Sequence, residues 1–198
     1  MGTLAIIILG VVLIMGLWLM SVYNTLVRYK NQVKNAWGQI DVQLQRRHDL
    51  IPNLVEAVKG YMAHERGTLE SVTNARNQAE AARTRIQAAG GPTDGSIKDL
   101  VVAESALQGG MTKLFAVAEN YPELRASENM QQLQEELSST ENKVAFARQS
   151  YNDMVLAYNN AQQVFPAMIV APMFGHHEVE QYQVEEPDAR KAVKVSFS

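Results

Sequence analysis

Four ionisable residues of this 198-residue chain fall where a helical pattern of apolar residues would bury them. Arg47 follows Leu44 in one such series. Glu104, Glu141 and Arg148 stand in equivalent places farther along the chain. Because a buried charge without a partner is costly, we expect these two acids and two bases to pair as a structural ionic layer between helices. Acid–base catalysis would need a neighbouring histidine, nucleophile or metal, and the pattern supplies none, so we expect no catalytic residue.

The histidines do not form a metal motif. His64 and Glu65 begin an H-E-x-x-H pattern, but Thr68 occupies the position of the second histidine. His176 and His177 are adjacent, and adjacent side chains point apart on an extended chain. The chain has no cysteine, which excludes disulfides, thiolate metal sites and thiol nucleophiles. A P-loop and a G-x-S-x-G elbow are also absent from the sequence. We therefore expect no metal, no cofactor and no enzyme activity.

The charge balance argues against nucleic acid as a partner. Only 20% of residues are charged and the net charge is −3, so a basic face that neutralises several phosphates is not available. Ala, Gln, Glu and Leu are abundant, whereas Gly and Pro are confined to a few places. This composition favours an all-α protein with one domain.

A membrane anchor is predicted near the N-terminus. Residues 4–23 contain no charge and, at about 1.5 Å per residue, would span the hydrocarbon core of a bilayer, with residues 1–3 as the N-terminal end. No basic residue precedes this segment and no small-residue cleavage site follows it, so we expect an uncleaved single-pass helix. Arg28, Lys30 and Lys34 come directly after it. By the positive-inside rule, the remaining domain is expected to be cytoplasmic.

Four amphipathic helices are predicted after the anchor, over residues 24–165. The second is expected from about 51 to 88, where a Gly- and Pro-rich loop follows. The third is expected behind Ser96 as N-cap and should stop before Pro122, and the fourth should begin behind Ser127 and run to about Pro166. Because such helices bury their apolar stripes against one another, we expect an antiparallel up-and-down four-helix bundle.

The stretch RRHDLIPNLVEAVKGY, residues 46–61, allows two interpretations. Asp49 could cap a new helix with Pro52 in its first turn, which would make this stretch a corner between two helices. However, the apolar series runs across Pro52 without losing phase, as a kinked continuous helix would also require. Spacing alone leaves both the corner and the kink open.

The tail, residues 166–198, has a different pattern. Val193, Val195 and Phe197 alternate within residues 192–197, which predicts a short strand. Since a lone strand is unstable, it must pair with residues 179–184 or with a neighbouring copy. We therefore expect the tail to help form a homo-oligomer, together with contacts between membrane helices through Gly10 and Gly16.

The chain resembles the LemA family of bacterial membrane proteins. The resemblance lies in YNTLVRYKNQVKNAWGQIDVQLQRRHDLIPNLVEAVKGYMAHE, in AENYPELRASENMQQLQEELSSTENKVAFARQSYNDMVLAYN and in ARKAVKVSF. It implies an inner-membrane anchor with its N-terminus outside, followed by an up-and-down four-helix bundle, and so favours the corner over the kink. A departure is Gly109–Gly110 inside the third helix, where helices either approach closely or are locally weak.

The resemblance also bears on function. It implies no established reaction and an association with membrane-protein quality control, envelope stress and membrane metalloproteases. Our leading hypothesis is a non-catalytic, membrane-anchored scaffold or adaptor that binds the bilayer, other membrane proteins and copies of itself. The alternative hypothesis is a membrane-anchored sensor of a small ligand or signal, which would need a cavity between helices.

Overall fold

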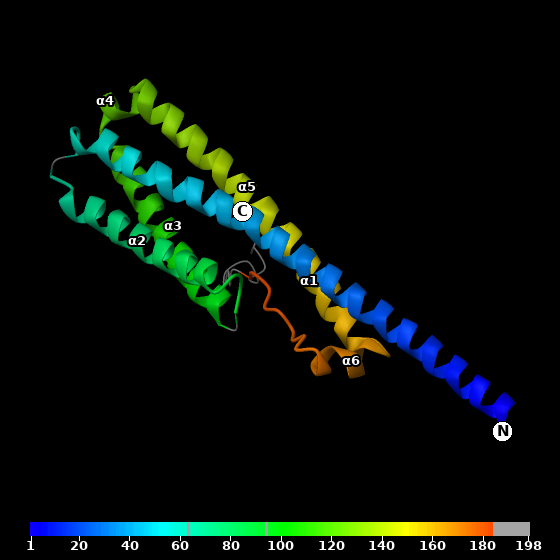
Figure 1. The fold of residues 1–198 in the computed structure, drawn as a ribbon. Coiled ribbons are helices and arrows are strands. Elements are labelled where there is room, and N and C mark those ends of the chain that lie inside the picture. The colour runs from blue at the N-terminus through cyan, green and yellow to red at the C-terminus, as the bar shows by residue number, and fades with distance from the viewer. Residues whose placement is uncertain (63, 94, 184–198) are drawn as a thin grey trace, which may run out of the picture.

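The chain is all-helical in this computed structural model, which describes residues 1–62, 64–93 and 95–183. The described residues form six helices and no strand. Figure 1 shows a long rod in which the helices run along one direction. The helices are α1 (Gly2–Lys59), α2 (Arg66–Ala88), α3 (Ser96–Ala118), α4 (Pro122–Arg125), α5 (Glu128–Gln163) and α6 (Ala167–Met173).

The helices pack mainly in two pairs. α1 lies along α5, and α2 lies along α3, with α2 also touching α1 (Figure 1). We call residues 26–59 of α1 together with α2, α3, α4 and α5 the helical body. Helices that follow each other in the chain return along the rod, so the apolar stripe of each one faces its neighbours. The short α6 packs against α1 and α5 at the end of the body from which α1 projects.

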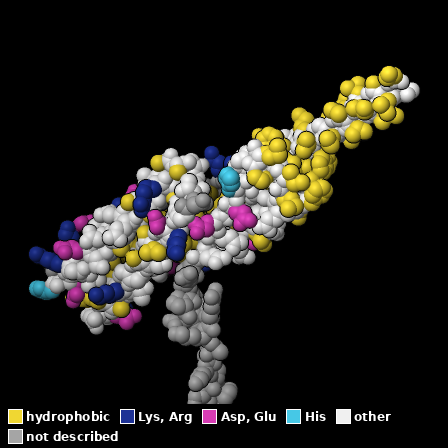
Figure 2. All heavy atoms as spheres, turned by 90° about the horizontal axis from the view of Figure 1, so that it is seen from below, with side chains coloured by type: hydrophobic (Ala, Val, Ile, Leu, Met, Phe, Trp, Pro, Cys, Tyr) yellow, Lys and Arg dark blue, Asp and Glu magenta, His cyan; other side chains and the backbone are white. Residues whose placement is uncertain are grey.

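The N-terminal part of α1 projects beyond the helical body. Its large apolar side chains are exposed, as at Leu13, which is 59% exposed. α1 includes one window that is long and apolar enough to cross a membrane, and none of that window is buried. Figure 2 shows hydrophobic side chains covering the projecting end, while charged side chains cover the other end of the rod. This part of α1 is therefore the candidate membrane helix.

The predicted corner at Asp49 and Pro52 is wrong. α1 continues through both residues to Lys59 with Pro52 inside the helix, and the chain turns only after Lys59, at residues 60–62. The expected second helix therefore loses its first turns to α1, and α2 begins at Arg66. Pro52 is exposed, whereas Ile51 and Leu54 are buried, so the proline ring faces outward and the apolar stripe keeps its phase.

The other helix boundaries lie close to the predicted ones. α3 ends at Ala118, before Pro122, and α5 begins after Ser127. Ser96 is the first residue of α3 and not its cap. Its hydroxyl donates to the carbonyl oxygen of Thr93 at 2.6 Å. In α3, a Cβ on Gly110 would lie 3.5 Å from Val72 Cγ2, so this glycine faces α2 at ordinary contact distance.

The core of the helical body is divided into two hydrophobic clusters. Polar residues lie between them on three helices: Arg47 and His48 on α1, Glu104 on α3 and Thr140 on α5 are all buried. The cluster nearer the membrane helix includes Trp37, Ile40, Leu44, Ala82, Ile86, Leu100, Val144 and Tyr151. The farther cluster includes Ile51, Leu54, Val58, Val72, Ala79, Leu107, Leu114 and Leu137.

The tail runs back along the helical body after α6. Residues 176–183 have no helix or strand (Figure 1). The expected pairing of residues 179–184 with residues 192–197 involves residues outside the described part of the chain. The predicted strand at 192–197, with Val193, Val195 and Phe197, lies outside the described residues.

Candidate functional site

Glu104 is the centre of the polar layer between the two hydrophobic clusters. Its Oε1 lies 2.7 Å from Nε2 of His48, and its Oε2 lies 3.4 Å from Nη1 of Arg47. Arg47 also donates to the side-chain oxygen of Gln108. Glu141 on α5 is a weaker partner, since its carboxylate lies 3.9 Å from Arg47 and its side chain is 51% exposed. One carboxylate of α3 therefore holds two cationic or hydrogen-bonding groups of α1.

The structure brings together three of the four ionisable residues that the sequence suggested. Arg47, Glu104 and Glu141 meet in this layer. Arg148 does not join them, because its guanidinium lies over the ring of Tyr182, 5.9 Å from the ring centroid. The sequence reasoning also missed His48, which it assigned to a corner and which is only 1% exposed.

The polar layer also explains how α1 accommodates a proline. Pro52 has no N–H, so the carbonyl of His48, four residues earlier, loses its helical hydrogen bond. Nε of Arg76, on α2, donates to that carbonyl at 3.2 Å. Arg76 is itself held by Glu80, with 2.7 Å between Nη2 and Oε2. A side chain of the neighbouring helix thus replaces the donor that Pro52 lacks, and α1 continues.

Glu104 is enclosed by its partners on α1. The buried Thr140 hydroxyl donates to the backbone carbonyl of Glu136 in its own helix. Among residues 1–62, 64–93 and 95–183, no group of three or more His, Asp or Glu side chains could hold a metal ion. A buried, paired charge specifies which helices face each other more than it stabilises them. The layer joins α1 to α3 by buried contacts and to α5 by one weaker contact.

A second polar arrangement lies beside the buried stripe of α5, where two partly buried asparagines hold the tail. Asn152 donates from Nδ2 to the carbonyl of Tyr182 at 3.1 Å and accepts from the Tyr182 amide at 2.8 Å. Asn159 makes the same pair of bonds with Val179, at 2.9 and 3.0 Å. Each side-chain amide thus satisfies both backbone groups of one tail residue. We call these four bonds and their residues the tail clasp.

The spacing of the clasp follows from helix and extended-chain geometry. Asn152 and Asn159 are seven residues apart, which is about 10.5 Å along a helix. Val179 and Tyr182 are three residues apart, which is about 10 Å along an extended chain. The two repeats match when the tail runs antiparallel to α5. An extended segment can therefore bond to both asparagines without distortion of either partner.

Aromatic residues complete the clasp. The Tyr151 hydroxyl donates to the carbonyl of Glu180 at 2.9 Å, and the Tyr158 hydroxyl lies 2.8 Å from Nδ1 of His176. Burial raises the pKa of Tyr151 and Tyr158 above its ordinary value, so both hydroxyls stay protonated and able to donate. Tyr182 is 3% exposed, which anchors the far end of the segment by its side chain.

The sequence contains a signal for this clasp in a repeated dipeptide of α5. Tyr-Asn occurs at Tyr151–Asn152 and again seven residues later at Tyr158–Asn159. The tyrosines belong to the apolar stripe of the helix, which predicts burial in the core and no more. The asparagines sit beside that stripe, and an exposed asparagine in a helix gives no indication of a backbone partner.

Comparison with known proteins places the chain in a family. The model of the LemA family matches residues 36–197. The magnetosome protein MamQ of Magnetospirillum gryphiswaldense is 24% identical over 198 residues, covering 90% of this chain and 71% of that protein. Protein LemA of Metamycoplasma hominis is 25% identical over 163 residues, covering 82% of this chain and 69% of that protein. With most of its length matched by the family model, this membrane-associated helical chain belongs to the LemA family.

Proposed function

We propose that this protein is a non-catalytic, membrane-anchored scaffold that forms homo-oligomers by exchanging tails between neighbouring copies. The observation that carries the proposal is the tail clasp, in which Asn152 and Asn159 bind backbone groups of Val179 and Tyr182. The helical body is proposed to act as an antiparallel four-helix bundle whose α5 face receives an extended segment. The same contacts form whether that segment comes from its own chain or from another copy.

Three features support exchange. The clasp is built almost wholly from bonds to the backbone, so leaving one chain and joining an identical one changes no interaction at the site. The turn before the tail is Gly175, whose φ of 69° lies where glycine is favoured, and a change there would redirect the whole segment. A membrane anchor confines copies to two dimensions and so raises their effective concentration, which favours weak contacts between them.

The setting of this scaffold is part of the proposal. Basic residues after the candidate membrane helix favour an inner-membrane protein with its N-terminus outside and its helical body in the cytoplasm. One relative is named a magnetosome protein, and another is named protein LemA. An oligomer with many clasps could also hold extended segments of other membrane proteins, membrane metalloproteases among them, in connection with quality control or envelope stress.

Crosslinking between two tagged copies tests tail exchange directly. Gln163 on α5 and Glu178 on the tail are both exposed and hydrogen-bonded at 2.8 Å. One full-length copy would carry Gln163→Cys and the other Glu178→Cys, in a chain with no other cysteine. After co-expression, a short bismaleimide added to membranes should join the two tags into one dimer band.

Two controls decide the result. The dimer should be lost when both copies carry Asn152→Ala and Asn159→Ala. Glu135→Cys in place of Gln163→Cys should give no dimer, because it is exposed on the same helix but about 42 Å away. If adducts form only when both cysteines are in one chain, the tail stays on its own helical body and the exchange model is wrong.

A further inference from the structure

A compact apolar segment lies beside the candidate membrane helix, and much of its surface is not covered by the helical body. Residues 164–175, VFPAMIVAPMFG, carry no charged side chain and include all of α6. Their large side chains point into open space, as shown by Phe165 at 73% and Met173 at 75% exposure. We call residues 164–175 the apolar foot. Its other exposed side chains are Val164, Met168, Ile169 and Phe174.

The foot is fixed to α1 by its opposite face. Ala167 and Ala171 are buried against Leu26, and small side chains there let α6 approach α1 closely. The ring of Phe174 lies 4.9 Å from that of Tyr23, at the end of the apolar stretch of α1. α6 is thus held at a defined level along α1, with its apolar face directed away from the protein.

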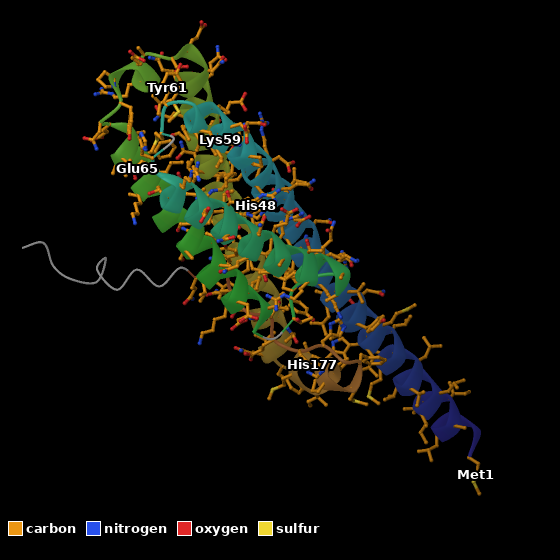
Figure 3. All side chains as sticks on the ribbon, turned by 90° about the vertical axis from the view of Figure 1, so that its left-hand side faces the viewer. Met1, His48, Lys59, Tyr61, Glu65 and His177 are labelled. Atoms are coloured by element: carbon orange, nitrogen blue, oxygen red, sulfur yellow. The ribbon has the colours of Figure 1, made fainter. Side chains whose placement is uncertain are left out.

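Three chain segments change from apolar to polar at this same level. On α1 the change comes after Tyr23, where Asn24 and Arg28 follow. On α5 the last polar residue before the foot is Gln163, and after the foot the chain becomes polar at His176. His177, labelled in Figure 3 beside α6, continues that polar side. The common level marks a boundary between water and an apolar medium across the whole cross-section.

We propose that the apolar foot is inserted into the bilayer beside α1, as a second membrane contact that enters and leaves from the helical-body side. Figure 2 shows further hydrophobic side chains at the end of the rod from which the apolar helix projects. A protein partner normally meets a polar rim around an apolar centre, and residues 164–175 provide no charged rim. Hydrocarbon requires none, and aromatic residues such as Trp18, Tyr23 and Phe174 suit the interfacial zone.

A groove next to the apolar foot also fits contact with lipid. It has a volume of about 560 Å³ and lies between α1, α5 and α6, with Trp18, Val22, Ala161 and Ala167 among its lining residues. An acyl chain lying along this groove would cover apolar surface that the protein leaves open at bilayer depth. The proposal does not depend on the clasp, since the foot is anchored to α1 whichever copy receives the tail.

Depth-dependent fluorescence quenching tests the insertion in the full-length protein. Single cysteines would be placed at Met168, at Leu13 in the candidate membrane helix and at Val102 on α3, three exposed apolar positions at 55%, 59% and 64%. Each would carry an environment-sensitive dye in vesicles of phosphatidylethanolamine and phosphatidylglycerol. At Met168 we expect blue-shifted emission, quenching by doxyl-labelled lipid and protection from aqueous iodide, as at Leu13 and unlike Val102.

Two outcomes would overturn the proposal. Iodide quenching at Met168 equal to that at Val102 would place the foot in water. A blue shift without doxyl quenching, which disappears when the protein is diluted with excess lipid, would show that a second copy covers the foot instead. A matching result at Ile169, the adjacent exposed position at 57%, guards against a local effect of one substitution.

Discussion

The polar layer and the tail clasp use polar side chains in opposite ways. In the layer, Glu104 pairs with the side chains of Arg47 and His48, all of them buried. In the clasp, Asn152 and Asn159 pair with backbone groups and are only partly buried. The layer therefore depends on the identity of each partner, whereas the clasp depends mainly on the extended shape of its partner.

This difference separates a permanent contact from an exchangeable one. Removing one member of the layer leaves a buried charge or hydrogen-bonding group without a partner, which is costly. When the tail leaves the clasp, both its backbone and the asparagines can bond to water, so losing these four hydrogen bonds costs little. The larger part of the cost is exposure of Tyr182, which leaves the core cluster. We accordingly expect substitutions in the layer to unfold the body and substitutions in the clasp to release the tail.

The largest effect is expected at Glu104. Glu104→Ala leaves Arg47 and His48 buried without their shared carboxylate and should lower the free energy of unfolding of the helical body by about 3 kcal/mol or more. Glu141→Ala is the matched control, and because that carboxylate is half exposed and 3.9 Å from Arg47, its cost should stay below about 1 kcal/mol. Urea unfolding followed by circular dichroism measures both. Equal costs would show that Glu104 is not the centre of the layer.

An intermediate effect is expected at Arg76. Arg76→Met keeps an unbranched side chain but leaves the carbonyl of His48 without the donor that compensates for Pro52. An unsatisfied buried carbonyl costs about 1–3 kcal/mol. In the double variant with Pro52→Ala, the new N–H of residue 52 can bond to that carbonyl, so Arg76→Met should cost less there than in the native background. A cost that is unchanged by Pro52→Ala would separate Arg76 from the proline.

A smaller effect on stability is expected in the clasp. Asn152→Ala and Asn159→Ala together should leave the unfolding of the helical body nearly unchanged while protease cleavage within residues 176–183 becomes much faster. Asn160→Ala is the control, because Asn160 is exposed and adjacent to Asn159. Cleavage by a nonspecific protease, followed by mass spectrometry, gives the rates. Equal rates in the three proteins would show that the asparagines do not hold the tail.

The smallest effect is expected from pH. Burial, with lesser contributions from Lys30 and His177, lowers the pKa of His176 below its ordinary value of 6.5. The released tail then binds protons more readily than the docked one, so docking should be complete above about pH 6.5 and weaken as the pH falls below it. Cleavage of the tail should therefore accelerate at about pH 5.5 relative to about pH 7.5.

Replacing the histidine tests the origin of that pH dependence. His176→Asn keeps a group that can bond to the Tyr158 hydroxyl but does not titrate, so the acceleration should disappear. His64→Asn, at an exposed position in the turn between α1 and α2, should leave it unchanged. An acceleration that survives His176→Asn would assign it to another group.

Much of the fold could be predicted because its signals are periodic. The apolar membrane stretch, the helix end before Pro122 and the helix start after Ser127 all follow from local sequence. The charges at Arg47 and Glu104 were recognisable because they interrupt apolar stripes. These features depend on residues close to one another in the sequence, and the structure places them near the predicted positions.

The features that were missed depend on contacts between distant segments. Pro52 left both a corner and a continuous helix open, because the sequence does not show that Arg76 would supply the missing donor. The position of Arg148 on an apolar stripe predicted a partner in the ionic layer. The stripe cannot show that the guanidinium instead lies over the ring of Tyr182, which is 34 residues later in the chain. The asparagines of the clasp bond to backbone groups, which every residue has. No residue type in the tail therefore predicts these contacts.

Amide hydrogen exchange resolved at single residues tests the clasp most directly. In the full-length protein, the amides of Val179 and Tyr182 donate to Asn159 and Asn152, whereas the structure gives the amides between them no acceptor among the described residues. Exchange should therefore be slow at Val179 and Tyr182 and fast at Glu180 and Gln181. Uniformly fast exchange across these four amides would contradict the account, because α5 would then not hold the tail by its backbone.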